Sequence, residues 1–193
     1  MVVMRATLTV EQNRDQQKGF MMTSAEPGVT RLFLEFSRQQ LVDEYWPRLR
    51  GCVESLTDEQ VWWRPNKASN SVGNLLLHLN GNVRQWLVAS FNGGEETRNR
   101  PAEFAQRQVI PAAALLRILG ATVEEASVVL SRLTEADLIG TRHIQGNTVT
   151  GLYAVYHVVE HFGMHYGQML YISKLVRGED LGFYRELNEA GRV

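Results

Sequence analysis

The chain has 193 residues, of which 44% are hydrophobic and 21% are charged. This is the size and composition of one globular domain. The 20 Lys+Arg nearly cancel the 21 Asp+Glu, so the basic surface of a nucleic-acid-binding protein is not expected. A single cysteine, Cys52, excludes an internal disulfide and a site built from several cysteines. No apolar run approaches the ~18–20 residues of a membrane span, and the N-terminus lacks a secretory signal pattern. Composition predicts a soluble, cytoplasmic protein that binds neither nucleic acid nor membrane.

Two regions differ along the chain. Residues 1–26 carry the polar run EQNRDQQK and no sustained apolar period, so we predict an N-terminal tail outside the core. Residues 27–193 are expected to form one domain.

Two long helices are predicted in the first half of this domain. Apolar residues keep one side of 29–55 hydrophobic, although Pro47 should kink or interrupt that helix. Thr57 to Gln60 has the spacing of a capping box and predicts a short helical turn. Asn70 or Ser71 can cap a second long helix over 71–91, stopped by Asn92-Gly93-Gly94.

Two more long helices are predicted in the second half of this domain. Residues 95–110 are polar and are interpreted as a connection, after which Pro111 suits the first turn of a helix over 111–133. One further turn is expected at 134–137, and a loop or small hairpin at 140–149. Thr150 then caps a long last helix that ends at Gly178. Four long helices with few strand signals predict an all-α fold, an antiparallel four-helix bundle.

Three of the five histidines, His157, His161 and His165, are spaced four apart on the last helix. Each step of four advances about 40° round a helix, so the three rings share one stripe, which also contains Gln168. Only two neighbours in such a run should reach the same ion, so a third ligand must come from elsewhere. His78 on the second helix is the best candidate. Imidazole suits Zn, Ni, Cu and Fe(II), and three histidines without a fourth protein ligand would leave the open position of a catalytic site.

Alternatives to a metal site remain open at this point. Histidines four apart on a helix are more often surface or hydrogen-bonded residues than ligands. The polar track that contains His78 could line a cleft between helices, but periodicity alone favours a solvated face. The track consists of Ser71, Asn74, His78, Asn82 and Gln85.

The segments NSVGNLLLHLNGNVRQW and YHVVEHFGMHYGQMLYISKL resemble the DinB/YfiT-like superfamily of metalloenzymes. The resemblance covers about residues 29–184 and is closest to an uncharacterised bacterial branch. It implies a four-helix bundle that binds a divalent metal, most often nickel or zinc and less often iron or manganese, through three histidines.

The resemblance also assigns roles to residues. The family's ligands fall on His78, His161 and His165, while His157 matches a histidine that is usually not a ligand and that we assign to catalysis. Amides beside the histidines are assigned to the second coordination shell or the substrate cleft: Asn74, Asn82 and Gln168. Many relatives have Arg where this chain has Tyr166, so their substrates are poor guides here.

Characterised members of the superfamily act on small molecules with low-molecular-weight thiols. The resemblance therefore implies a metal-dependent S-transferase-like enzyme, or a hydrolase if water takes the place of the thiol. His157 and Glu160 are candidate proton-handling groups, although Glu160 is better explained as an exposed or interhelical pairing residue. The alternative is a non-catalytic bundle that binds a metal or another ligand, and a third hypothesis is a bundle without a physiological metal.

Four other features carry weaker predictions. The last helix is apolar nearly all round, which predicts a homodimer through it or cover from the tail or from residues 180–184. Trp62 and Trp63 are interpreted as anchoring contacts. His143 matches no ligand and suits a surface role. The segment 100–104, RPAEF, looks typical of the family but suggests no chemical role.

Overall fold

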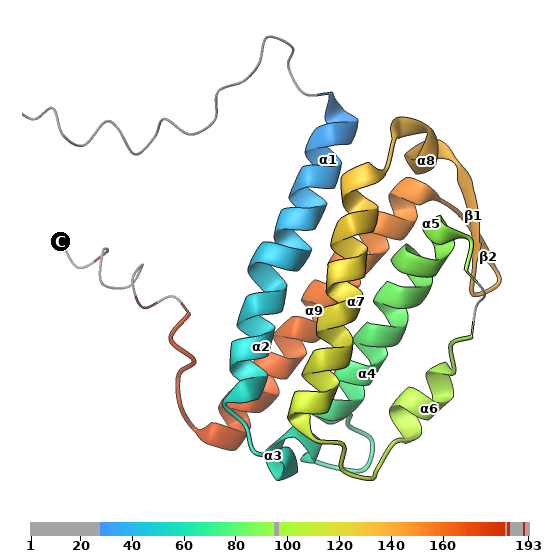
Figure 1. Cartoon of the computed structure of the whole chain (residues 1–193). Helices are drawn as coiled ribbons and strands as arrows, with labels where there is room; N and C mark the ends of the chain where they lie inside the picture. The colour runs from blue at the N-terminus through green and yellow to red at the C-terminus, as the bar shows by residue number, and fades with distance from the viewer. Residues whose placement is uncertain (1–27, 95–96, 184, 186–190, 192–193) are drawn as a thin grey trace, which may run out of the picture.

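The computed structural model describes residues 28–94, 97–183, 185 and 191. These residues form four long helical rods packed side by side, which confirms the predicted all-α four-helix bundle (Figure 1). The predicted tail at residues 1–26 lies outside the described residues.

The first rod is helical throughout, but it is not a uniform α-helix. It consists of α1 (Val29–Arg38), the π-helical segment η2 (Gln39–Tyr45) and α2 (Trp46–Glu54). Pro47 has no N–H to give to a carbonyl in the preceding turn, so the α-helical pattern cannot continue unchanged through it. The wider π-helical turns precede this proline, where the sequence predicted a kink or an interruption.

The second rod also contains π-helical turns. It consists of α4 (Val72–Val83), η3 (Arg84–Ala89) and α5 (Ser90–Asn92). Its start is a capping box in which the Ser71 hydroxyl accepts a hydrogen bond from the Asn74 N–H, and the Asn74 side chain accepts one from the Ser71 N–H. Gly93 ends the rod in the left-handed conformation. The predicted boundaries are therefore close to the observed ones.

The third and fourth rods are joined by a short helix and a hairpin. The third rod is α7 (Ala112–Arg132), which is followed by α8 (Glu135–Ile139). Strands β1 (Thr141–Ile144) and β2 (Asn147–Thr150) pair antiparallel with Thr141 opposite Thr150. The fourth rod is α9 (Gly151–Arg177), capped by Thr150 and ended by Gly178 at φ 70°.

Two short helices complete the described part of the chain. The helix α3 (Asp58–Trp62) begins with the predicted capping box at Thr57. Its Trp62 anchors the loop, because the indole Nε1 donates a 2.9 Å hydrogen bond to the Ile110 carbonyl. The helix α6 (Arg100–Ala105) lies against α4 on the outside of the bundle, within the segment predicted to be only a connection (Figure 1).

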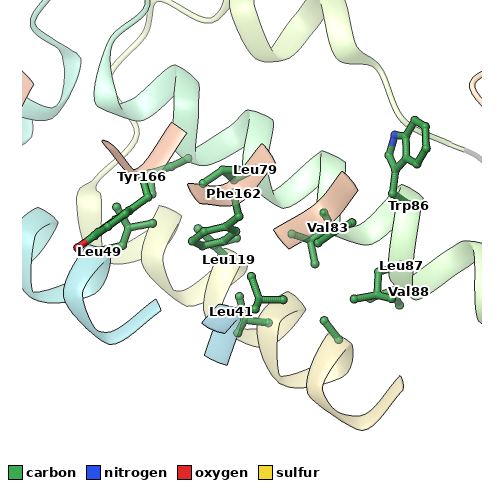
Figure 2. Packing of buried hydrophobic residues seen from close by; sticks show 14 of the residues in the cluster. Leu41, Leu49, Leu79, Val83, Trp86, Leu87, Val88, Leu119, Phe162 and Tyr166 are labelled. Atoms are coloured by element: carbon green, nitrogen blue, oxygen red, sulfur yellow. The ribbon is translucent and has the colours of Figure 1, made fainter. Parts of the chain in front are cut away.

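The apolar core lies between the four rods. Figure 2 shows side chains from all four rods meeting near its centre: Leu41, Leu79, Leu119 and Phe162. Each of these is fully buried. The core therefore fixes α4 against α9, the two elements that carry His78, His161 and His165.

The outer face of α9 is less covered than its apolar composition suggested. Its exposed large hydrophobic side chains are Leu152, Tyr153, Tyr156, Met164, Tyr171 and Leu175. Among the described residues, no helix is both long enough and apolar enough to span a membrane.

Candidate metal centre

Three imidazoles converge between α4 and α9. One ring nitrogen from each of His78, His161 and His165 lies within 4.8 Å of the other two. The Nε2 atoms of His78 and His161 are 2.8 Å apart. His78 and His165 are buried and His161 is half-buried, so the three rings lie just beneath the surface of the bundle. These are the three side chains in which the sequence predicted a metal site.

Helix geometry explains which histidines meet. His161 and His165 are one turn apart on α9, and their ring centroids are 4.5 Å apart. His157 is one turn earlier, stacked on His161 at 5.0 Å, and it does not belong to the converging group. Its Nε2 instead lies 3.1 Å from the Asn82 side-chain nitrogen. The run of three thus provides two converging rings and one neighbour.

Hydrogen bonds on the outer nitrogens orient two of the three rings. His78 Nδ1 lies 2.9 Å from Glu103 Oε2, and His165 Nδ1 lies 2.9 Å from Gln168 Oε1. Both oxygens are acceptors, so each ring carries its proton on Nδ1 and keeps an Nε2 lone pair. This carboxylate- or amide-oriented tautomer is typical of histidines that ligate metals.

The carboxylate behind His78 is itself held by an arginine. Arg98 donates to both Glu103 oxygens at 2.7 and 2.8 Å, and the two side chains are only 6% and 11% exposed. Arg98 also donates to Gln85 Oε1 and to the His78 carbonyl. Arg98 Nη2 lies 3.0 Å from His78 Nδ1 as well, but Nη2 already donates to Glu103 and to that carbonyl, so we assign the Nδ1 proton to the Glu103 bond. The hydrogen bonds from Arg98 therefore fix the position of the Glu103 carboxylate beside His78.

A glycine makes room for this ion pair. A Cβ on Gly81 would overlap Glu103 Oε1 and would lie 2.7 Å from Arg98 Nε. Any larger residue at position 81 would therefore displace the pair from the wall of α4.

The local electrostatics favours neutral imidazoles and an ionised Glu103. Burial, followed by the nearby His165, His78 and His157, lowers the pKa of His161 to about 3. Burial also lowers the pKa of His165. For Glu103, burial alone would raise the pKa, but hydrogen bonds from Arg98 and His78 outweigh it and hold the pKa below its ordinary value. At neutral pH His161 and His165 are thus in the form that can ligate a metal.

The shift at His161 predicts that the protein, once stripped of metal with a chelator, loses stability at acid pH. The folded-state pKa of His161 is below its ordinary value of 6.5, so below that pH the unfolded chain binds a proton that the folded chain does not. The stability that depends on an unprotonated His161 is fully present above pH 6.5 and is lost as the pH falls towards 3. The melting temperature should therefore fall over this window, and it should fall less in His161→Gln. An equal pH dependence in the two proteins would contradict the predicted shift.

Comparison with known proteins follows this geometry. The sequence profile of the family described as "Protein of unknown function (DUF1572)" matches residues 28–185. The chain belongs to this family. It is a DinB-like family, so the predicted superfamily is confirmed. No curated protein matches the chain.

Solved structures share the fold, and two of them align with most of this chain. A conserved protein from Enterococcus faecalis aligns with a TM-score of 0.64 at 21% identity, over 75% of this chain and 97% of its own. A DinB-like protein from Bacillus cereus ATCC 10987 aligns with a TM-score of 0.56 at 17% identity, over 74% of this chain and 89% of its own. At these identities the likeness shows the fold alone.

The polar track on the second rod is buried, which corrects the solvated face that periodicity favoured. Ser71, Asn74, His78, Asn82 and Gln85 are each at most 7% exposed. Some of their partners are polar groups of α6 and its flanks, because Asn74 donates to the carbonyls of Glu103 and Gln106 and Gln85 accepts from Arg98. Asn82 instead pairs with His157 on α9. Polar periodicity reveals that a face has polar partners but does not reveal whether they are water or protein.

The remaining predicted site residues lie at different distances from the three histidines. Gln168 contacts His165 and Asn82 contacts His157, whereas Asn74 caps α4 and holds the backbone of α6. Tyr166, where many relatives have Arg, is buried in the core with its ring 5.2 Å from that of Tyr45. Glu160 is exposed.

His143 lies where the sequence predicted, whereas the pair Arg98–Glu103 was not predicted to belong to the site. His143 is exposed in β1 and its Nδ1 lies 3.1 Å from the Thr148 hydroxyl, which fits the predicted surface role. Arg98 was not predicted as a site residue. Glu103 was given no role, although the RPAEF segment that contains it was noted. Asn99 as an N-cap, with Pro101 in the first helical turn, is a recognisable helix start that could have indicated α6, but no spacing links Glu103 to His78.

Proposed function

We propose that this protein binds one divalent metal ion through Nε2 of His78, His161 and His165 and uses it to transform a small molecule. The convergence of three ring nitrogens within 4.8 Å is the observation that carries this proposal. Glu103 and Gln168 support it, because they hold two of the rings in the ligating tautomer.

The donor set favours nickel or zinc. Three neutral imidazoles without a carboxylate suit these borderline ions, and iron is a weaker fit. Manganese prefers oxygen ligands and fits least. A site with three protein ligands leaves a coordination position open, as catalytic metal sites do.

We propose thiol transfer, with hydrolysis as the related alternative. When bound, the metal favours the ionised form of a thiol or water at its open position. His157 is the residue placed to take up the released proton, because its ring stacks on that of His161 and burial, by lowering its pKa, leaves the ring unprotonated at neutral pH. Asn82 holds the ring of His157 by donating to Nε2, the one unprotonated nitrogen of the neutral ring, so this hydrogen bond must open when Nε2 takes up the proton. Glu160 is exposed and suits proton transfer less well.

The role of His157 predicts a separation of binding from catalysis. His157→Gln should keep the bound metal but lower kcat by about 10²–10⁴-fold. The assay follows loss of thiol, and separately release of hydrolysis product, with a generic electrophile and the zinc- or nickel-loaded protein. Unchanged turnover in this variant would contradict the role of His157. Absence of turnover with every thiol and with water would favour the alternative of a non-catalytic metal-binding bundle.

We also propose that the protein forms a homodimer through α9. The exposed apolar face of this helix includes Tyr171, which is 66% exposed. The substitution Tyr171→Glu would place a charge in that interface and should convert the dimer to a monomer in sedimentation or light-scattering measurements. Phe36→Glu is a matched control, because Phe36 is 62% exposed on α1. A monomeric wild-type protein would refute the dimer.

A further inference from the structure

Two buried polar atoms on side chains that contact His157 lack hydrogen-bond partners in the described part of the chain. Among the described residues, Asn82 Oδ1 and Trp86 Nε1 are buried and unpaired. Their side chains are 3% and 5% exposed. Buried polar groups in proteins are nearly always paired, so two unpaired atoms one helical turn apart indicate that a bound group supplies the partners.

Both side chains flank His157. The Asn82 nitrogen lies 3.1 Å from His157 Nε2, and the Trp86 ring centroid lies 4.1 Å from that of His157. In Figure 2 the indole of Trp86, at the edge of the apolar cluster, points away from Leu87 and Val88. Tyr153 is half-exposed and lies 6.2 Å from His157 and 6.3 Å from Trp86 between ring centroids. The three rings thus lie together beside Asn82, and His157 connects them to His161.

The polarity of the two atoms defines the group that would fit. The indole N–H can only donate, and the amide oxygen of Asn82 can only accept. A secondary amide offers a carbonyl to the indole and an N–H to Asn82, and it is flat enough to pack against the rings. An ionised carboxylate has no donor for Asn82 Oδ1, and an alkyl group would leave both atoms unpaired.

We infer that Asn82, Trp86 and His157 form a subsite for an amide group of the small molecule held at the three-histidine centre. This inference rests on the proposed metal site, and it adds the substrate class: a small, neutral, amide-containing molecule, most simply a thiol whose chain carries the amide.

Three thiols that differ in their tails test the subsite. The cobalt-loaded protein is titrated with N-acetylcysteamine, 3-mercaptopropionate and 1-propanethiol, and the cobalt–sulfur absorption band is measured. We expect N-acetylcysteamine to bind about tenfold more tightly than either of the others, the combined value of two hydrogen bonds at the lower end of their usual range. Trp86→Phe keeps a ring but removes the N–H, so the preference should fall to about twofold. Trp63→Phe, a change at a half-exposed tryptophan on α3's flank, should leave it unchanged.

The outcomes separate this inference from the metal site. If cobalt does not bind, both proposals fail. If cobalt binds and the three thiols bind equally, the metal site stands and the subsite is refuted, as would happen if a buried water satisfied both atoms. Should Trp86→Phe not fold by circular dichroism, Asn82→Ser provides the second variant, and a preference that persists in it would also refute the subsite.

Discussion

Replacing His78 or His161 with alanine should abolish stoichiometric metal binding. We expect about one zinc or nickel ion per wild-type chain, and affinity lowered by more than about 100-fold in either variant, because each removes one of three ligands. Elemental analysis of the purified proteins, combined with a competition titration against a chelator, measures both quantities. His78 comes from α4 and His161 from α9, so equal losses would indicate that both helices contribute to one site.

An exposed histidine provides the control for this experiment. His143→Ala removes an imidazole on β1 that lies outside the converging group, so it should leave metal content unchanged. If His78→Ala retained the wild-type stoichiometry, the three-histidine site would be wrong, whatever the other variants showed.

Glu103→Gln should weaken metal binding without removing a ligand. Loss of the negative charge behind His78 makes its ring a poorer donor, and outer-shell changes of this kind typically cost 10–100-fold in metal affinity. The buried Arg98 also loses its carboxylate partner, so the melting temperature should fall. Glu103→Gln should therefore lower both the affinity and the stability, whereas Gln168→Ala, at the exposed Gln168, should mainly lower the affinity.

The ion pair can also be displaced without changing either member. Gly81→Ala should push Glu103 and Arg98 away from α4 and reproduce much of the affinity loss of Glu103→Gln. Gly51→Ala is the matched control, because a Cβ at Gly51 meets nothing within 4 Å and lies in a helix too. Wild-type affinity in Gly81→Ala would show that the contact between Glu103 and His78 does not control the site.

The long helices were predictable from the sequence because local signals determine their limits. Ser71, Thr150 and Gly178 each have a capping role that depends only on neighbouring residues, and the structure places all three at helix ends. Pro47 predicted an interruption of the first rod but not its π-helical form, and no sequence signal indicated the π-helical turns after Val83.

The site was predictable only in part. The spacing of His161 and His165, together with the family resemblance, indicated which rings should meet. Glu103 and Arg98 could not be found in this way, because they reach His78 from a separate segment that has no periodic pattern of its own. Burial of Asn74 in the polar track has the same origin, since its side chain donates to the backbone of α6.

A crystal of the zinc-loaded protein, measured above and below the zinc absorption edge, tests the central claim most directly. We predict one strong anomalous peak per chain, within about 2.0–2.1 Å of Nε2 of His78, His161 and His165, and a fourth position occupied by solvent or added thiol. A peak bound elsewhere, or one that excludes His78, would contradict the proposed centre and the chemistry built on it.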